Sequence, residues 1–360
     1  MSEPSSTLDQ LLATLGKLPD VRAEGTQLEH RGSVPSRLYD ARIDLQVRER
    51  PVTVLVEVKK SLYPRDVRQA LWQLREYTSA TKLAPDREIQ PMLVAEFISP
   101  GAKELLRVER VGYFDSGGSL FLPARAAYLY IDKPPPKTFE RSIRTLFSGR
   151  RAQVIHALLV CDRVWFGVTE IAKEAKVAPS TASEVLTQLD RFDWLETRGQ
   201  GPSKERRLRE PGSLLDAWAK HQSVLRPSPV RRYYVPEFKG AALPPRVSQI
   251  FHRHQVTYAL TSEAAAQLYA PFLTTVSVVR TRILAGPTVE TAIADLDARV
   301  VNEGANLILL ESKFAGEFLF CQQLDGIRLA SPVQVYLDLL RGEARSKELA
   351  EHLRRERIKF

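Results

Sequence analysis

Hydrophobic and polar residues along the first third of the chain follow the periods of alternating strands and helices. Residues 42–47 alternate apolar and polar side chains, which is typical of a half-buried strand. Residues 52–60 are apolar on both faces until their end, which is typical of a strand covered on both sides. We therefore expect a mixed α/β domain. Its helices are expected at 8–18, 64–80 and 100–107, and its strands at 42–47, 52–60, 91–98, 112–115, 120–122 and 128–131.

The pattern from 165 to 209 predicts two helices joined by a tight turn and followed by a hairpin. Thr169 is expected to cap a helix over 170–175, and Pro179 suits the first turn of a second helix. Apolar residues recur at helical spacing on one face of this second helix, at Ala182, Val185, Leu186 and Leu189. Strands are expected at 194–197 and 204–209, around a tip rich in Gly and Pro. A helix over 139–159 precedes these elements, and a helix over 214–221 follows them.

This order predicts a winged helix-turn-helix, whose second helix lies in a DNA major groove while its hairpin meets phosphates. The alternative is an ordinary helical hairpin followed by a charged loop. The residues predicted to bind DNA are small polar side chains on the second helix and basic side chains on the hairpin. They are Ser180, Thr181, Ser183, Thr187, Gln188, Arg198, Lys204, Arg206, Arg207 and Arg209. Because the exposed face of that helix has no Lys or Arg before Arg191, we expect modest sequence discrimination.

Two proline-rich stretches, at 133–137 and 226–232, predict linkers and therefore three domains: 1–132, 138–222 and 231–360. The last domain is expected to be α/β, which makes the whole chain an α+β multidomain protein. Ser331 is predicted to cap a helix that has Pro332 in its first turn. Helices are expected within 258–268, with a cap near Thr261, and at 289–299, 331–340 and 346–358. Strands are expected at 275–279, 282–284 and 306–311.

Composition and charge indicate an anionic partner and a cellular compartment. The 360 residues have a formal net charge of +9, for which nucleic acid is the first candidate partner. There is no uninterrupted apolar run near 20 residues and no signal-peptide pattern, so we expect a cytoplasmic protein that does not bind membranes. The two cysteines, Cys161 and Cys321, lie far apart without metal-ligand spacing and are expected to be buried thiols.

Candidate chemistry lies at the end of the buried strand at 52–60. Glu57 and Lys59 are two residues apart, so their side chains share one face. If the preceding turn is a two-residue hairpin, Asp44 falls opposite Leu55, on that face and diagonal to Glu57. Two carboxylates would then hold Mg²⁺, and the lysine would stabilise charge on a phosphate. The alternative is that Glu57 and Lys59 are only the solvated end of a strand.

The succession of Asp44, then Glu57-Val58-Lys59, then a helix with Gln69 and Gln73 resembles the PD-(D/E)xK pattern of restriction-endonuclease-like domains. The resemblance implies catalytic roles for Asp44, Glu57, Lys59 and Gln73, with Asp44 and Glu57 as Mg²⁺ ligands, if the domain is active. Glu24 and Glu29 are candidates for the upstream acid often found in this superfamily. The fold is often retained as a non-cutting module, so we expect no cofactor unless the site is active.

The last part of the chain resembles the C-terminal region of AbiEi-type antitoxins, the transcriptional regulators of type IV toxin–antitoxin systems. The resemblance is carried by 258–261 with its Ala-rich helix, by 329–332 and by 336–340. It implies a regulator that binds double-stranded DNA as a homodimer and has a nucleotidyltransferase-like toxin as partner. The N-terminal nuclease-like domain departs from the simplest AbiEi antitoxins. The alternatives are a Mg²⁺-dependent nuclease targeted to DNA by the winged domain and a DNA-binding assembly protein of a mobile element.

Overall fold

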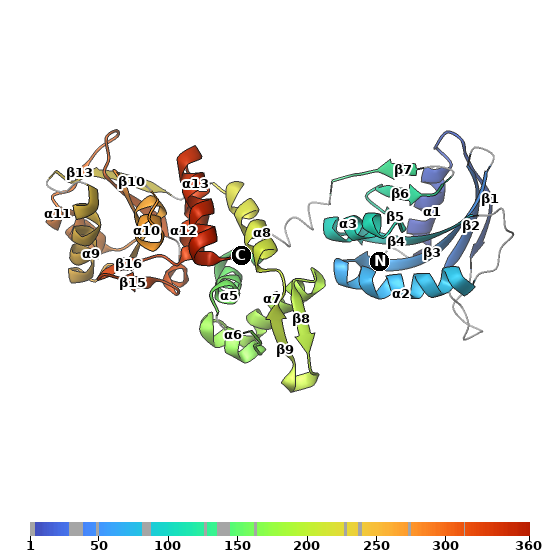
Figure 1. Cartoon of the computed structure of the whole chain (residues 1–360), viewed down its shortest axis with the longest axis horizontal. Helices are drawn as coiled ribbons and strands as arrows, with labels where there is room; N and C mark the ends of the chain where they lie inside the picture. The colour runs from blue at the N-terminus through green and yellow to red at the C-terminus, as the bar shows by residue number, and fades with distance from the viewer. Residues whose placement is uncertain are drawn as a thin grey trace. The chain divides into compact units, whose positions relative to one another are not determined.

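The chain forms two compact units of α+β structure (Figure 1). The computed structural model describes residues 4–28, 39–47, 50–80, 88–125, 128–134, 145–161, 164–226, 229–236, 240–272, 275–312 and 314–360. The first unit comprises Met1–Ser142 and Gln188–Asp193, and the second comprises Ile143–Thr187 and Trp194–Phe360. Most of the predicted linker at 133–137 lies outside the described residues. Across the described ranges, no helix has the length and apolar character needed to cross a membrane.

The first unit is built on a seven-stranded sheet whose strands are ordered as in the chain. The strands are β1 (Val21–Leu28), β2 (Ala41–Val47), β3 (Arg50–Leu62), β4 (Glu88–Ile98), β5 (Gly112–Asp115), β6 (Leu120–Pro123) and β7 (Tyr128–Ile131). The central strands β3, β4 and β5 run parallel, and the other neighbours pair antiparallel. The helices are α1 (Pro4–Leu15), α2 (Pro64–Ala80) and α3 (Pro100–Val108). The predicted elements are present, although the first helix spans Pro4–Leu15 and not 8–18, and β1 is an additional edge strand that the sequence pattern did not predict.

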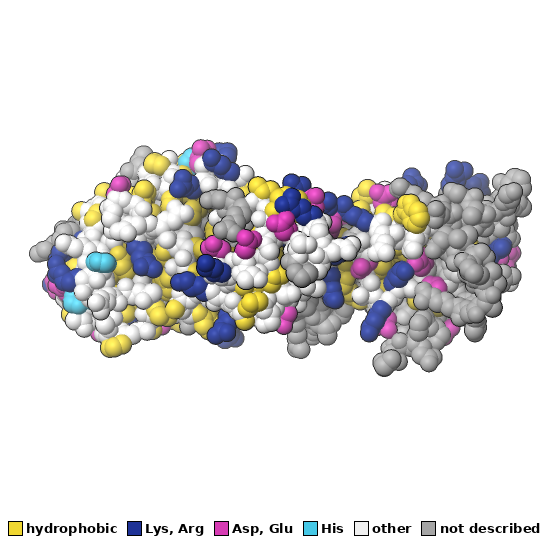
Figure 2. All heavy atoms as spheres, turned by 90° about the horizontal axis from the view of Figure 1, so that it is seen from below, with side chains coloured by type: hydrophobic (Ala, Val, Ile, Leu, Met, Phe, Trp, Pro, Cys, Tyr) yellow, Lys and Arg dark blue, Asp and Glu magenta, His cyan; other side chains and the backbone are white. Residues whose placement is uncertain are grey.

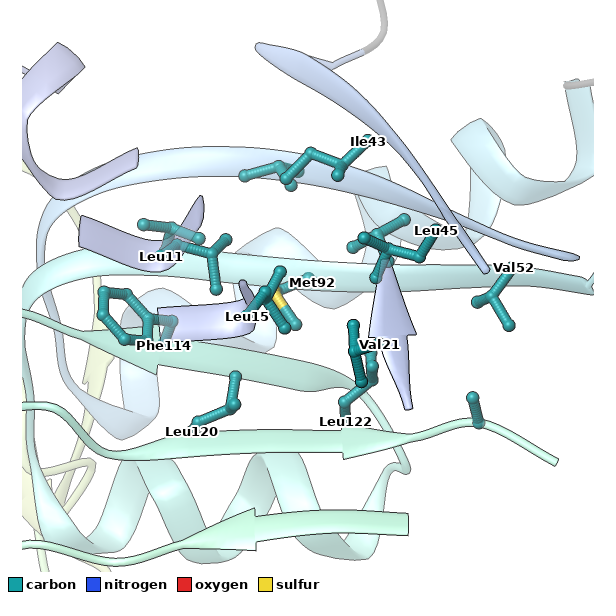
Figure 3. Packing of buried hydrophobic residues seen from close by; sticks show 14 of the residues in the cluster. Leu11, Leu15, Val21, Ile43, Leu45, Val52, Met92, Phe114, Leu120 and Leu122 are labelled. Atoms are coloured by element: carbon teal, nitrogen blue, oxygen red, sulfur yellow. The ribbon is translucent and has the colours of Figure 1, made fainter. Parts of the chain in front are cut away.

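Apolar side chains cover both faces of this sheet. On one face Leu11 and Leu15 of α1 pack with strand residues such as Leu45, Met92 and Phe114 (Figure 3). On the other face, buried residues of α2 and α3 form a second cluster with strand residues of that face. Burying one large aliphatic side chain stabilises the fold by about 1.5–3 kcal/mol. This double cover explains why β3 is apolar on both faces until its end.

The second unit contains another seven-stranded sheet, of mixed direction, with the order β13-β10-β14-β12-β11-β16-β15. Its strands are β10 (Val230–Tyr234), β11 (Tyr258–Thr261), β12 (Val279–Leu284), β13 (Arg299–Val300), β14 (Leu307–Ser312), β15 (Gln322–Leu324) and β16 (Ile327–Leu329). Its helices are α9 (Leu243–Arg253), α10 (Ser262–Tyr269), α11 (Pro287–Asp295), α12 (Pro332–Leu339) and α13 (Ala344–Leu353). Helices α9 and α11 pack together, and α10, α12 and α13 pack together (Figure 1).

Several boundaries predicted for this sheet were wrong. The helix expected within 258–268 begins at Ser262 with Thr261 at the cap position, as predicted, but the residues before it, 258–261, form a strand that the sequence pattern did not predict. Residues 275–278 are not in a strand, because the pairing of β12 with β14 begins at Val279. Helix α11 ends at Asp295, four residues earlier than predicted, and Asp297 has a φ of 48°, which helical geometry does not allow. The predicted cap at Ser331 is confirmed, since its hydroxyl accepts a hydrogen bond from the Gln334 N–H at 3.1 Å.

The helices and hairpin predicted over 139–221 are also part of the second unit, apart from 188–193 and masked residues. They are α5 (Gly149–Val160), α6 (Val168–Glu174), α7 (Pro179–Arg191), β8 (Leu195–Arg198), β9 (Glu205–Leu208) and α8 (Pro211–Ser223). The helix predicted over 139–159 is confirmed only from Gly149 on, because Phe147 and Ser148 are not helical and 139–144 lie outside the described residues. Thr169 is not the cap of α6: the helix begins one residue before it, with Gly167 at the cap position. The Gly167 N–H donates to the Glu170 carboxylate at 2.9 Å. A side chain three residues into the helix thus satisfies a backbone donor at the helix start.

A buried polar contact joins α5 to α12. His156 of α5 is buried, and its Nε2 lies 2.5 Å from the hydroxyl of Ser331. The His156 ring also packs 4.7 Å from the ring of Phe320 and 5.6 Å from that of Trp218. Burial, and secondarily the positive charge of Arg282, lower the pKa of His156 to about 3. The imidazole is therefore neutral in the folded protein at neutral pH.

His156 should make the protein less stable in mild acid. The pKa of His156 is about 6.5 in the unfolded chain and lower in the folded protein, so the unfolded chain binds the proton preferentially. This part of the stability is complete above about pH 6.5 and declines as the pH falls towards 3. We expect a loss of about 2 kcal/mol between pH 7 and pH 5. Urea unfolding measures the free energy of unfolding at both pH values. Between pH 7 and pH 5, His156→Gln should lose less of it than the wild type, and the control His252→Gln, a change on the surface, should lose as much as the wild type. Equal losses in wild type and His156→Gln would contradict the assignment.

Candidate functional site

The pairing of β2 with β3 decides which acidic residues meet at the end of the buried strand. Ala41 lies opposite Val56, and Asp44 lies opposite Thr53. Asp40, the residue before β2, extends this ladder, since its N–H donates to the Val56 carbonyl at 2.8 Å. Asp40 is therefore at the level of Glu57, the first polar residue of the strand end.

Three charged side chains gather at this level. The Asp40 carboxylate accepts a hydrogen bond from the N–H of Val58 at 2.8 Å. Glu57 is buried, and its Oε1 lies 2.5 Å from the Lys59 ammonium. The other Glu57 oxygen, Oε2, is buried without a hydrogen-bond partner. Such an atom is costly in a folded protein unless a water, a ligand or an ion satisfies it.

The predicted site residue Asp44 does not belong to this group. It lies opposite Thr53, four strand residues before Glu57 and so about 13 Å away along the strand. Its carboxylate accepts a hydrogen bond from the Thr53 hydroxyl at 2.6 Å and pairs with the Arg42 guanidinium at 3.1 Å. The prediction was wrong because Val47 pairs with Arg50, so the ladder is offset by two residues from the register that places Asp44 opposite Leu55.

Helix α2 brings the predicted glutamines to this end of the sheet. Gln69 and Gln73 lie one turn apart and line a surface pocket together with Lys59. The upstream acid candidates do not join them. Glu24 lies on β1 at an irregular point of the ladder beside Asp44, and Glu29 lies outside the described residues.

The strand end has two carboxylates at one level of the sheet, those of Asp40 and Glu57. Across the described parts of the chain, no group of three or more His, Cys, Asp or Glu side chains is placed to bind a metal. Mg²⁺, however, is commonly held by one or two carboxylates while it keeps several waters. Asp40 and Glu57 are the residues of this strand end that could hold such an ion, and Glu57 Oε2 is a buried oxygen without a hydrogen-bond partner.

The second candidate site is the surface formed by helix α7 and the hairpin β8–β9. Helix α7 has an apolar and a polar face. Ala182, Val185, Leu186 and Leu189 are buried, as predicted. On the polar face Ser180 and Thr187 are exposed, whereas Thr181, Ser183 and Gln188 are partly buried. The turn before α7 contains Lys176 at a φ of 50°. The predicted order of helix, tight turn and helix is thus observed, and it leaves the N-terminal end of α7 open to solvent.

The basic residues of the hairpin β8–β9 lie on two opposite faces. Residue Phe166 pairs antiparallel with Arg206 on the free side of β9, so β9 is the middle of three backbone segments. Both of these residues are buried. Neighbouring Arg207 points to the other face and is exposed. Arg206 was predicted to contact DNA, but its burial places it on the inner face of the hairpin.

Exposed arginines of the hairpin are paired with glutamates across the strands. Arg198 Nη2 lies 2.7 Å from the Glu205 carboxylate, and Arg207 Nη2 lies 2.5 Å from that of Glu196. Arg209 is exposed and Lys204 is partly buried. Figure 2 likewise shows Lys and Arg side chains interspersed with acidic and hydrophobic ones on the face that it displays. On that face, the net positive charge does not form one continuous patch.

Comparisons with known proteins add little to this geometry. No protein-family model matches the chain, and no curated protein matches it. A solved structure described as EndoMS in apo form aligns at 15% sequence identity and a TM-score of 0.21. The alignment covers 32% of this chain and 47% of that chain, so this chain spans about half the length of that structure. A match at this level carries no argument about function.

Metal binding should distinguish Asp40 from Asp44. We expect Asp40→Asn and Glu57→Gln each to weaken Mg²⁺ or Mn²⁺ binding about tenfold or more, because each removes a carboxylate ligand. Asp44→Asn is the matched control, since it removes a carboxylate from the same strand pair without touching the site. Isothermal titration calorimetry of the full chain measures all three. Loss of binding in Asp44→Asn, or unchanged binding in both other variants, would contradict this assignment.

Proposed function

We propose that this protein binds double-stranded DNA through a winged helix-turn-helix formed by α6, α7 and the hairpin β8–β9. The observation that carries the proposal is the polar face of α7, on which Ser180 and Thr187 are exposed, together with a hairpin that has outward arginines. In such a motif the second helix enters the major groove and the hairpin lies along the phosphate backbone. The order of the elements, the short turn and the buried apolar face of α7 all support it.

In this proposal, helix α7 and the hairpin contact different parts of the DNA. Ser180 lies at the N-terminal end of α7, where backbone N–H groups favour a phosphate, and Thr187 lies two turns further along the helix. Arg198, Arg207 and Arg209 of the hairpin supply charge for further phosphates. Because Ser, Thr and Gln can pair with several bases, the readout of sequence is modest. Affinity therefore comes mainly from the backbone of the DNA.

The biological role that we propose is transcriptional regulation, as in AbiEi-type antitoxins. The resemblance rests on the strand at 258–261 with its following helix and on the capped helix that begins at Pro332. In this proposal the protein acts as a homodimer on an operator, and a nucleotidyltransferase-like toxin is its partner. In this proposal the role is carried by the second unit, which contains this region, α6, the hairpin and the first part of α7.

A second candidate function is Mg²⁺-dependent cleavage of DNA at the strand end of the first unit. It is favoured by the buried, unsatisfied Glu57 oxygen at the level of Asp40, next to Lys59. These residues and the parallel strands around them are consistent with a restriction-endonuclease-like domain. A bound Mg²⁺ would polarise the phosphate and lower the pKa of a bound water. Asp40 and Glu57 would hold the ion, and Lys59 would stabilise negative charge on the phosphate.

DNA binding should depend on the outward arginines. We expect the double change Arg198→Ala and Arg207→Ala to weaken binding to all sequences and to reduce the slope of log K against log salt by about two, one per lost phosphate contact. Arg253→Ala, which removes an exposed arginine that pairs with Asp295, is the matched control and should leave the slope unchanged. Fluorescence anisotropy with a labelled duplex over a salt series measures both. An unchanged slope in the double variant would contradict the hairpin assignment.

Cleavage of supercoiled plasmid with Mg²⁺ or Mn²⁺ tests the second candidate function. If the strand end is catalytic, Asp40→Asn, Glu57→Gln and Lys59→Ala should each lower the rate about 100-fold or more, because each removes a ligand or a charge-stabilising group. Asp44→Asn should cut at the wild-type rate, and all four variants should still bind DNA. Wild-type protein that does not cut would make the first unit a non-cutting module. Cleavage that persists in the three site variants would place the chemistry elsewhere.

A further inference from the structure

The outward face of the hairpin carries an ordered row of side chains. Because Phe166 and Arg206 exchange backbone hydrogen bonds of 2.9 Å, the preceding Trp165 falls beside Arg207. Glu196 lies on the other side of Arg207. The alternation of side chains puts Trp165, Arg207 and Glu196 on one face, directed away from the buried side. Arg198 and Glu205, opposite one another, form the next row of the same face.

Trp165 contacts both arginines of this face. The Arg198 guanidinium carbon lies 4.2 Å from the centre of the indole ring, and that of Arg207 lies 5.3 Å from it. Each arginine is also held by a glutamate: two nitrogens of Arg198 bind Glu205 at 2.7 and 2.8 Å. Two nitrogens of Arg207 bind Glu196 at 2.5 and 2.9 Å. Each guanidinium thus has an aromatic ring and a carboxylate as neighbours.

We propose that Trp165 positions Arg198 and Arg207 for the phosphates of duplex DNA, and that Glu196 and Glu205 compete with those phosphates. This inference rests on the proposed DNA binding and assigns residues to it. An exposed ion pair in water contributes little to stability, so a phosphate can take the place of the carboxylate. The cation–π contact with Trp165 is compatible with a bound phosphate, since the ring and the anion occupy different sides of the guanidinium. An arginine that is already ordered loses less conformational entropy on binding.

The sign of the glutamate effect separates this role from a structural one. If the ion pairs only support the hairpin, replacing a glutamate should leave DNA affinity equal to that of a matched control, or lower it. If the glutamates compete with phosphates, the same replacement should raise affinity beyond the control. Glutamine keeps the length of the side chain and removes only its charge. Glu290→Gln is the control, since Glu290 is an exposed glutamate of the same unit that pairs with Arg231.

The experiment is a salt series of fluorescence anisotropy with the full chain and a labelled duplex. We expect Glu196→Gln and Glu205→Gln each to bind about threefold to tenfold more tightly than Glu290→Gln. Trp165→Ala should bind about tenfold more weakly and show a smaller salt slope, whereas Trp165→Phe should recover most of the affinity because it retains an aromatic face. Circular dichroism of each variant checks that the fold is intact.

Two outcomes overturn the inference in different ways. If wild-type protein binds DNA but both glutamate variants match Glu290→Gln or bind more weakly, the glutamates are not competitors, and the proposed DNA binding still stands. The positioning role of Trp165 is likewise overturned if Trp165→Phe binds as weakly as Trp165→Ala. If wild-type protein does not bind the duplex at any salt concentration, the proposed function and this inference fail together.

Discussion

The register of strand pairing is the constraint on which both candidate sites depend. Side chains on a strand alternate between faces, so pairing decides which residues share a face and a level. In the first unit, the pairing of Ala41 with Val56 brings Asp40 to the level of Glu57. In the second unit, the pairing of Phe166 with Arg206 directs Trp165 and Arg207 outward together. The side chains of each group are not adjacent in sequence. A shift of either strand register by one residue would move the members of that group to opposite faces.

Burial determines how the basic residues of this protein can be used. The net charge of +9 suggests an anionic partner, yet many arginines are already engaged. Arg282 is buried in an ion pair with Asp338 at 2.6 Å, which belongs to the packing of the second unit. Arg198 and Arg207 of the hairpin are exposed instead, and the glutamates paired with them are partly exposed. An exposed ion pair can be replaced by a phosphate at little cost, whereas a buried one cannot.

The elements of the fold were largely predictable, because hydrophobic periodicity is a local property. Helix α2 and strand β5 begin and end where the pattern predicted, and the cap at Ser331 was recognised from the Ser-Pro pair. The site was less predictable, because it depends on contacts between strands. The position of the turn between β2 and β3 moved the acidic partner of Glu57 from Asp44 to Asp40. Asp40 was not among the predicted site residues; its place directly before an alternating strand is the signal that could have found it.

The burial of Arg206 could not be predicted for the same reason, since only the pairing partner of a hairpin strand shows which of its residues face inward.

Hydrogen–deuterium exchange of the full chain, with and without duplex DNA, tests the central claim of DNA binding most directly. DNA binding through this surface should slow exchange at residues 164–167, at the N-terminal end of α7 and along 195–208. DNA binding with protection confined to other parts of the chain would contradict it, as would the absence of any protection at saturating duplex.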